Sequence, residues 1–523
     1  MIKAIKIENL RSLKDTGFIE IKPLTILLGT NSSGKSTFLR SFLLFTQSVN
    51  KRLRGPISWF DDSLVDFGDF YTALNAEAKE NGAPIRFSFR AEKASFDRYP
   101  RGFGLFTSNS RNLLSQNYEF SISLSCDEGE TYISEVSLLD GDLDIKASIS
   151  GRNEQVTFTL GGKPLKTSEK LKWSYSPYNS ILPTFEYKSK DIIRRIGTIT
   201  EEELINFVKE RSSTTLTSKE KIYMLFHKSV TNKEELLEYL KTRYNIKSFS
   251  KYVRLHNWTT RSKEFNQLYG YLALCHFLNV FSIIDLQLTS FYSECSYIAP
   301  ARAEANRYYR TQGLQVVDVD PYGRNLQEFI ASLDDNQKKS YQEFTKRLLK
   351  VIVDIVPQEG HQSIVLKSEH GVYNMADVGF GYSQILPIVT KLWYASNSRI
   401  SGIGRGRVYY RPALENANIL IEQPELHLHP AYQAKIADAI MEAANKAKKD
   451  KRRNSFVVET HSEVFINRLG RRVKERLFEK DDVTIVLFNK GIKDKNTSVR
   501  ELTFKENGYI QDWPYGFFDP DND

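Results

Sequence analysis

Hydrophobic and polar residues alternate with a period of two along the first part of the chain. Isoleucine and charged residues alternate at positions 5–7 and 19–21, which is typical of strands with one buried face. The same alternation returns between about residues 85 and 160, in the segments IRFSFR, YEFSISL and VTFTL, which glycine-bearing turns separate. This pattern predicts an antiparallel β-sheet in the N-terminal part of the chain.

From about residue 200 to 290 the hydrophobic period becomes helical. Leu236, Leu240 and Tyr244 fall on one face of a predicted helix, and a second, long helix is expected over Glu264–Leu286. Residues 291–523 return to mixed strands and helices. Because the helical block separates the first motif of the chain from all later ones, we interpret it as an insertion.

The first candidate for chemistry is Gly29–Ser36, which reads GTNSSGKS and matches G-x-x-x-x-G-K-[ST] at every fixed position. An apolar run precedes it and a helical repeat of Phe and Leu follows, so a strand, a glycine turn and a helix start would aim backbone N–H groups at an anion. A chance glycine turn does not explain the full match. Lys35 is expected to reach the β- and γ-phosphates of a nucleoside triphosphate, and the Ser36 hydroxyl to ligate Mg²⁺. The predicted nucleotide-binding residues are Gly29, Thr30, Asn31, Ser32, Ser33, Gly34, Lys35, Ser36 and Thr37.

A second motif, Asn418–Glu425, reads NILIEQPE and is followed by LHLHP. An apolar strand that ends in an acid before a proline turn describes a Walker B element, in which Glu422 would hold the Mg²⁺ shell opposite Ser36. The alternative is a buried strand that ends in a carboxylate by chance.

Two further segments complete the set of motifs. The strand FVVE and the following THS deliver His461, where a histidine can touch the γ-phosphate or the attacking water, although a capped strand end is the alternative. The segment Asp377–Gln384, DVGFGYSQ, precedes an apolar helix and predicts a second anion-binding helix start. The phosphate loop of the same chain already accounts for the phosphates of its own nucleotide. This second helix start therefore favours two chains paired head to tail, in which it faces the nucleotide of the partner. Its expected contacts to the partner's nucleotide are Gly381, Ser383 and Gln384.

In this order, GTNSSGKS, DVGFGYSQ, ILIEQPELHLHP and ETHS resemble the motifs of an ABC-type ATPase, and the chain is similar to the SMC-like and OLD-like ATPases of prokaryotes. The segment Asn9–Arg11 resembles the nucleotide-contacting segment of that group, which implies that Arg11 contacts ATP. The stretch 508–518 is also typical of one branch. Within the group the chain looks most like the PtuA family, ATPase subunits of Septu-type antiphage defence that also occur beside some retrons.

The resemblance implies an α/β fold, namely an ABC-type P-loop ATPase head with an antiparallel β subdomain and a helical insertion. Residues 1–190 and 291–523 would form the two parts of the head, and 191–290 the insertion. ATP and Mg²⁺ are the implied cofactors. The implied partners are a second copy of the chain in a head-to-tail dimer or larger oligomer, and a separate HNH nuclease of the PtuB kind. In a retron setting, a reverse transcriptase and its RNA–DNA product (msDNA) would hold the complex inactive.

The sequence departs from this family at the end of the Walker B strand. ABC ATPases usually carry Asp and then Glu there, and that Glu polarises the attacking water. Here the pair is Glu422–Gln423, and a glutamine cannot accept a proton. Glu425 is the candidate substitute, so the predicted catalytic set is Gln423, Glu425 and His461. Hydrolysis is expected to be slow or absent, which leaves a non-hydrolysing ATP-sensing scaffold and a DNA-repair ATPase that clamps DNA ends as rival functions.

The charge of the chain permits a polyanionic partner, because the net charge is +9 and the pI is near 9.0. Two basic stretches are candidates for nucleic-acid contact. Lys247–Lys263 interleaves basic and aromatic residues and is alternatively a protein-docking face, whereas Lys446–Arg453 is nearly all basic and is alternatively a solvated loop.

The remaining composition favours a reducing cytoplasm. Three scattered cysteines argue against a disulfide framework or a zinc site. The longest apolar run, near Phe277–Leu288, is interrupted by Asn279 and Asp285, so no membrane span is expected. His427 and His429 have metal-ligand spacing but lack an evident third ligand nearby, which disfavours a metal site.

Overall fold

The computed structural model divides the chain into two compact units. The residues that it describes are 2–93, 114–152, 155–165, 171–174, 180–188, 193–195, 197–212, 230–242, 247–293, 295–311, 313, 316, 318–397, 417–491 and 494–514. Unit 1 contains Met1–Phe18, Gln47–Phe60 and Phe67–Ser293, and unit 2 contains Ile19–Thr46, Asp61–Asp66 and Glu294–Asp523.

These units cut across the predicted segments 1–190, 191–290 and 291–523. The phosphate-loop segment, residues 19–46, belongs to unit 2 together with the C-terminal part of the chain. The helices of 191–290 share unit 1 with the N-terminal strands. The reason is that segments far apart in the sequence pair as neighbouring strands, which a reading along the chain does not reveal.

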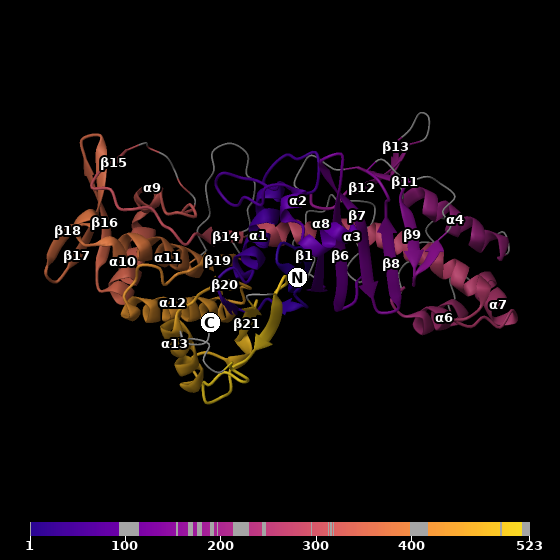
Figure 1. Cartoon of the computed structure of the whole chain (residues 1–523). Coiled ribbons are helices and arrows are strands. Elements are labelled where there is room, and N and C mark those ends of the chain that lie inside the picture. Colours follow the sequence, from indigo (N-terminus) through magenta and orange to yellow (C-terminus); the bar gives the residue numbers. More distant parts are fainter. Residues whose placement is uncertain are drawn as a thin grey trace. The chain divides into compact units, whose positions relative to one another are not determined.

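Unit 1 is built on the predicted antiparallel sheet, with strand order β10-β9-β8-β7-β6-β5-β1-β2 (Figure 1). Its alternating residues do face opposite sides, since Ile85, Phe87 and Phe89 of β5 are fully buried. A second sheet has the order β11-β12-β13. The strands are β1 Ile2–Leu10, β2 Leu13–Asp15, β5 Ile85–Glu92, β6 Asn117–Asp127, β7 Glu130–Asp140, β8 Leu143–Ser148, β9 Thr157–Leu160, β10 Lys163–Leu165, β11 Leu171–Ser174, β12 Thr184–Lys188 and β13 Ile193–Arg195.

The predicted helices of unit 1 are present. Leu236 and Leu240 are fully buried on α6, while Tyr244 lies outside the described residues. The expected long helix is α8, which extends beyond the predicted end and packs against α4, β8 and β1. The helices are α2 Phe70–Ala73, α3 Ala76–Asn81, α4 Gly197–Glu210, α6 Lys233–Thr242, α7 Lys247–Leu255 and α8 Lys263–Ser293.

Helix α8 is the one described helix that is long and apolar enough to cross a membrane by length and composition. Its most apolar stretch is 61 % buried inside the structure, as expected for the core helix of a globular protein. Asp285 does not interrupt it, because its carboxylate accepts hydrogen bonds from the backbone N–H groups of Ile181 and Leu182 and from the Ser180 hydroxyl. The hydrogen-bonding capacity of this carboxylate in an apolar helix is therefore met by groups of the protein itself.

Unit 2 is built on a mostly parallel sheet with strand order β14-β19-β20-β4-β21-β22, in which only β22 runs antiparallel to its neighbour. The strand of the ETHS motif, β20, lies between the Walker B strand β19 and the phosphate-loop strand β4. A smaller antiparallel sheet joins β15, β16, β17 and β18. The strands are β3 Ile19–Glu20, β4 Leu24–Gly29, β14 Cys295–Ile298, β15 Tyr309–Arg310, β16 Ile352–Gln358, β17 His361–Ser368, β18 Gly371–Asn374, β19 Asn418–Glu422, β20 Ser455–Glu459, β21 Val483–Asn489 and β22 Ser498–Leu502.

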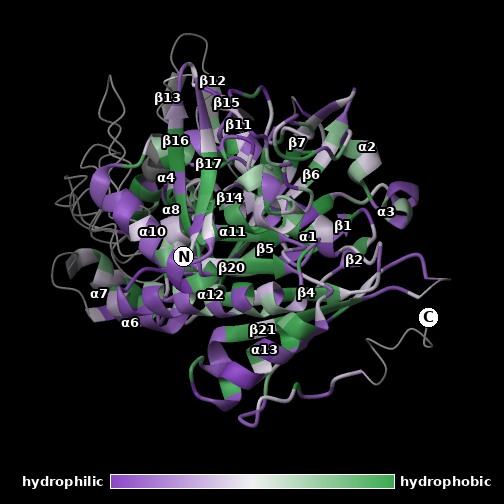
Figure 2. Ribbon diagram, turned by 90° about the vertical axis from the view of Figure 1, so that its left-hand side faces the viewer, coloured by the Kyte–Doolittle hydropathy of each residue, from purple (hydrophilic) through white to green (hydrophobic). Residues whose placement is uncertain are grey.

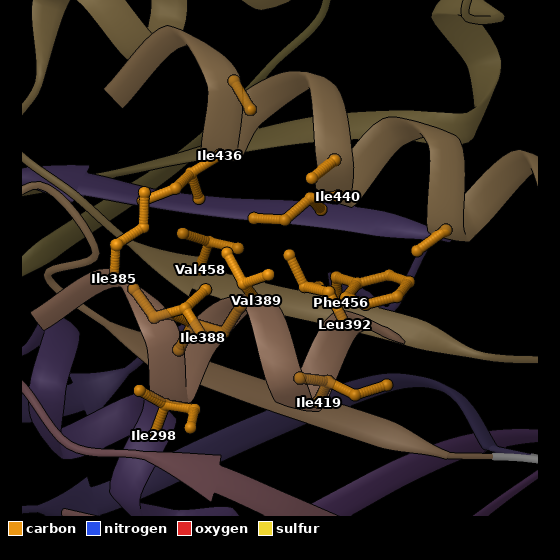
Figure 3. Close-up of a cluster of buried hydrophobic side chains, with 14 of the residues drawn as sticks. Ile298, Ile385, Ile388, Val389, Leu392, Ile419, Ile436, Ile440, Phe456 and Val458 are labelled. Carbon is orange, nitrogen blue, oxygen red and sulfur yellow. The ribbon is translucent and has the colours of Figure 1, made fainter. Parts of the chain in front are cut away.

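The core of unit 2 lies between this sheet and its helices. The strands β20 and β21 carry the hydrophobic colour in Figure 2, as expected for parallel strands covered on both faces. Aliphatic side chains of α11 and α12 meet those of β14, β19 and β20 in one buried cluster (Figure 3). The helices are α1 Lys35–Val49, which continues past Thr46 into unit 1, α9 Leu326–Ala331, α10 Asp335–Leu349, α11 Phe380–Ser396, α12 Pro430–Lys449 and α13 Glu463–Lys474.

Candidate functional site

The loop between β4 and α1 has the backbone that the motif Gly29–Ser36 predicts. Gly29 has φ +150°, and a Cβ atom there would lie 2.1 Å from the carbonyl oxygen of Phe488 on β21. A side chain at this position is therefore excluded by the neighbouring strand. Gly34 has φ +96° where α1 begins, so both glycines of the motif meet a local backbone requirement.

Lys35 is folded back over this loop. Its ammonium nitrogen donates to the carbonyl oxygens of Gly29 at 3.0 Å and Thr30 at 2.6 Å, and the residue is only 3 % exposed. Burial lowers the pKa of Lys35, while the carboxylates of Glu459 and Glu425 oppose that shift. The loop thus holds a desolvated cation at the N-terminus of α1, which is an arrangement suited to phosphate.

Ser36 contacts a carboxylate that the sequence analysis did not single out. Its hydroxyl donates to Glu459 Oε1 at 2.8 Å. Glu459 ends β20, is 2 % exposed, and its second oxygen is buried with no partner among the described residues. Burial, and then the charge of Glu422, raise the pKa of Glu459 to about 7. One sequence signal could have identified Glu459, because FVVE, like ILIE, is an apolar strand that ends in an acid.

Glu422 lies beside Glu459 but has different contacts. The two residues are register partners on β19 and β20, so both side chains emerge at the carboxyl edge of the sheet. Arg40 on α1 donates from Nε to Glu422 Oε2 at 3.1 Å and from Nη2 to Oε1 at 2.6 Å, and the Tyr297 hydroxyl also donates to Oε2. Burial lowers the pKa of Arg40, but its hydrogen bonds to Glu422 outweigh this and leave the pKa raised. The role of Glu422 as a Mg²⁺ ligand opposite Ser36 stays a prediction.

The three predicted catalytic residues lie at the ends of β19 and β20. Gln423 has a left-handed backbone, with φ +45°, and its N–H donates to the carbonyl oxygen of Glu459 at 2.8 Å. The carboxylate of Glu425 accepts from the Thr460 hydroxyl at 2.8 Å and from the backbone N–H of His461 at 2.7 Å. Burial raises the pKa of Glu425 and lowers that of His461, on which the charge of Lys35 acts in the same direction.

The segment Asp377–Gln384 leads into α11 as predicted, but two of its side chains point inward. Ser383 is 4 % exposed and its hydroxyl donates to the carbonyl oxygen of Phe380 at 2.7 Å, while Gln384 is fully buried. The turns of α11 that carry them also carry the core residues of the cluster in Figure 3. The exposed part of the first turn is instead Phe380, after Gly379 at φ +87° and before Gly381. Both side chains are buried within unit 2, and their role as contacts to a partner's nucleotide stays a prediction.

Arg11 belongs to unit 1, where its contacts are local. Its guanidinium lies over the ring of Phe67, 4.3 Å from the ring centre, and its backbone N–H donates to the carbonyl oxygen of Ala73. Its backbone is left-handed, with φ +51°. The role of Arg11 as an ATP contact stays a prediction.

The two histidines after the Walker B strand have structural partners. The His427 ring packs edge-on against Phe380, and His429 caps α12 by accepting from the N–H of Ala431 at 3.2 Å. Within the described part of the chain, no group of three or more His, Cys, Asp or Glu side chains is placed to hold a metal ion.

The aromatic residues of Lys247–Lys263 are largely used inside unit 1. Trp258 is 1 % exposed and packs against Phe207, Phe249 and Tyr252, so it is not available to stack on a base. The basic stretch Lys446–Arg453 includes the last turn of α12 and the residues after it, and makes local contacts as well. Lys448 pairs with Asp482, and Arg452 donates to the carbonyl oxygens of Ala395 and Ser396.

Comparison with known proteins matches residues 1–269 and 318–466 to a family described as the AAA ATPase domain. No curated protein matches the chain. Among solved structures, the chain is similar to the SmcHead bound to the C-winged helix domain of ScpA, with 11 % identity over 97 % of this chain and 98 % of that chain, at a TM-score of 0.35. Similar values hold for the Smc head domain with an extended coiled coil bound to the C-terminal domain of ScpA, derived from Pyrococcus furiosus (12 % identity, 96 % and 96 %, TM-score 0.33). The SMC head domain from Thermotoga maritima gives 8 % identity, 95 % and 98 %, and a TM-score of 0.33.

Proposed function

Because this chain belongs to the AAA ATPase domain family, we propose that it binds ATP with Mg²⁺ at the loop between β4 and α1 and hydrolyses it slowly. The observation that carries the proposal is the convergence of Lys35, Ser36 and Glu459 at the carboxyl ends of two paired parallel strands, β4 and β20. Open α/β sheets bind their ligands at this edge, and the phosphate-loop motif lies there.

The loop residues 29–37 would hold the phosphates. Their backbone N–H groups and the start of α1 supply oriented donors, and Lys35 supplies the positive charge. The ammonium of Lys35 donates to two neutral carbonyl oxygens. Phosphate oxygens would replace them as acceptors, because charge-assisted hydrogen bonds are about twice as strong as neutral ones.

The oxygen atoms beside Ser36 fit a hard cation such as Mg²⁺. Ser36 offers a hydroxyl, and Glu459 offers a carboxylate with one buried oxygen that lacks a partner among the described residues. Glu422 is adjacent, although its carboxylate is engaged by Arg40. Mg²⁺, when bound, neutralises phosphate charge and orients the substrate. The residues Ser36, Glu459 and Glu422 would hold it.

Slow hydrolysis follows from the groups available to take a proton from water. Gln423 cannot accept one, and both oxygens of Glu425 already accept hydrogen bonds. The remaining acid beside the loop is Glu459, but it would also hold Mg²⁺, and a bound cation makes a carboxylate a weaker base, so general-base catalysis by Glu459 would be slow. The lowered pKa of His461 keeps its imidazole neutral at pH 7, so it would act as a hydrogen-bond partner for the phosphate rather than as a cation.

Two chains would pair head to tail around ATP, with the start of α11 facing the partner's nucleotide. The support comes from the order of the motifs and from the exposed first turn of α11. Gly379 precedes that turn without a side-chain cap, so backbone N–H groups around Phe380 and Gly381 have no capping side chain. The contact to the partner's phosphate would therefore be made by backbone N–H groups rather than by Ser383 and Gln384.

In the cytoplasm, the ATP-bound assembly would control a separate HNH nuclease as part of an antiphage defence system. In a retron setting a reverse transcriptase and its msDNA would keep that nuclease inactive. The support is the resemblance of the four motifs to the PtuA family. Co-expression with the neighbouring genes tests this role, with co-purification and phage plaque counts as readouts. Protection that survives loss of this chain would contradict it.

The nucleotide site itself is tested by binding of a fluorescent ATP analogue with Mg²⁺. Lys35→Ala should weaken binding by about 10²-fold, because charged hydrogen bonds contribute roughly 1.5–3 kcal/mol. Lys505→Ala, which removes an exposed lysine of the same unit, is the matched control and should bind like the wild type. Equal affinity of the Lys35→Ala variant and the wild type would overturn the assignment of this loop.

A further inference from the structure

The guanidinium of Arg302 is buried and contacts the turn that carries two of the predicted catalytic residues, Gln423 and Glu425. The residue is 4 % exposed and follows β14. Its Nη2 donates to two successive carbonyl oxygens at the end of β19, those of Glu422 and Gln423, each at 3.2 Å. Its Nε and Nη1 are buried without a partner among the described residues. Burying a cation with incomplete partners costs free energy, so its position calls for a role other than stability.

The backbone of Arg302 is held at the same time by α11. The N–H of Arg302 donates to Gln384 Oε1 at 3.3 Å, and Gln384 Nε2 donates back to the carbonyl oxygen of Arg302 at 3.2 Å. Gln384 is fully buried, and its Nε2 also lies 3.3 Å from the hydroxyl of Ser383 in the first turns of α11. One residue thus connects the start of α11 to the end of the Walker B strand.

The turn that Arg302 holds is conformationally demanding. Gln423 has φ +45°, a conformation that a non-glycine residue adopts only when its surroundings impose it. Its N–H is held from one side by Glu459, and its C=O from the other side by Arg302. Glu425, two residues on, is also the carboxylate whose charge acts most strongly on Arg302. Loss of Arg302 would therefore remove a hydrogen bond that holds the turn at residues 423–425. The conformation of the phosphate loop would not change.

We propose that Arg302 is a positioning residue that couples the first turn of α11 to the Gln423–Glu425 turn. A change at the start of α11, where the proposed partner contact lies, would move Gln384, the backbone of Arg302 and then its guanidinium. The Gln423–Glu425 turn would shift in response, and the rate of ATP hydrolysis would change. This inference rests on the proposed function, because the rate it controls is that of ATP hydrolysis.

The kinetic test compares Arg302→Met and Arg302→Lys with Arg310→Met, an exposed arginine in the same unit. Arg302→Met should lower kcat at least about tenfold, since small misplacements at an active site can cost about 10² in rate. ATP affinity should stay within about twofold, because the guanidinium contacts no residue of the phosphate loop among the contacts described, and Arg302→Lys should retain part of the rate. A parallel loss of affinity, or an unchanged kcat, would overturn the proposal.

The coupling is tested by Gln384→Ala, which leaves the guanidinium in place. This variant should lower kcat as Arg302→Met does, and the double variant should be no slower than either single one. Without nucleotide, Gln384→Ala should also speed hydrogen exchange of peptides that contain residues 423–428. Additive effects on kcat would overturn the coupling. Unchanged exchange in Gln384→Ala would overturn it as well, and that measurement does not depend on whether Arg302→Met folds. A wild type that binds no ATP would overturn the proposed function instead, and the exchange result would still decide the coupling.

Discussion

The hydroxyl of Ser36, in the first turn of α1, donates a 2.8 Å hydrogen bond to the carboxylate of Glu459, 423 residues later in the chain. This contact brings together the phosphate loop and the end of β20. It identifies Glu459 as an acid that is hydrogen-bonded to the predicted Mg²⁺ ligand of the loop, whereas Glu422 is hydrogen-bonded to Arg40. The predictions below follow from this arrangement.

Glu459→Gln should lower the steady-state rate of phosphate release by about 10²–10⁴, the usual contribution of a general base. The amide cannot accept a proton and binds Mg²⁺ less well than a carboxylate. Nucleotide binding and phosphate release are measured side by side, with the exposed Glu506→Gln as the control. A rate equal to that of the wild type would exclude Glu459 from both roles.

Gln423→Glu should raise the rate of phosphate release, because it restores a carboxylate that can polarise water, an effect worth up to about 10²–10⁴. It should also weaken repression of the partner nuclease, because we interpret slowly hydrolysed ATP as a clamp that holds the two chains of the repressing assembly together. Glu425→Gln is measured in the same series, and its amide would face the N–H of His461 without a second acceptor oxygen. If the wild type turns over rapidly and only Glu425→Gln stops it, Glu425 is the base and the clamp interpretation is wrong.

Arg40→Met should destabilise the protein by leaving the carboxylate of Glu422 buried without its cation. Breaking a buried pair costs about 3–5 kcal/mol, and we expect about 2 kcal/mol here because the Arg40 side chain is 37 % exposed. Urea unfolding measures the difference. The double variant Arg40→Met/Glu422→Gln should recover part of the loss, since no unpaired charge remains, and equal instability of the two variants would argue against this explanation.

The stability of the nucleotide-free protein should depend on pH through Glu459. Its pKa is raised from 4.5 to about 7, so the folded state retains a proton that the unfolded state has released. This contribution is fully present below pH 4.5 and is lost as the pH rises through about 7. Glu459→Gln removes the effect, so its stability relative to the wild type should grow by up to about 3 kcal/mol as the pH rises, at about 1.4 kcal/mol per pKa unit. Urea unfolding of both proteins across this range, without Mg²⁺, tests it, and a difference that is independent of pH would contradict it.

Gly381→Arg should block head-to-tail pairing while leaving ATP binding to a single chain intact. A Cβ atom at Gly381 meets nothing closer than Leu428, at 4.0 Å, so the substitution fits the fold, unlike one at the buried Ser383. Mixed with Lys35→Ala, this variant would form one composite site with both halves intact. ATP-dependent association, measured by sedimentation, should reappear only in the mixture, with Gly381→Ala as the control. A mixture without association would contradict the head-to-tail arrangement.

Local features of the site could be predicted because they depend on residues next to one another in the chain. The strand before Gly29, the glycine turn and the helix that begins at Lys35 all have short-range signals, and the structure has them at those positions. The antiparallel sheet and the long helix α8 follow from hydrophobic periodicity in the same way. Periodicity did not give the division into units, since the pairing of β4 with β20 and β21 joins distant segments.

The sequence by itself determined which residue types this protein has for phosphate, Mg²⁺ and proton chemistry, and where along the chain they lie. Only the tertiary structure decided which of them meet. In the sheet, β20 pairs directly with β4 and separates it from β19. As a result Glu459, the acid that ends β20, is hydrogen-bonded to Ser36. Glu422, the acid that ends β19, is hydrogen-bonded to Arg40. Likewise, packing of α11 against the core turned Gln384 toward Arg302. Strand order and helix orientation are set by burial of apolar surface over the whole unit, which no single motif encodes.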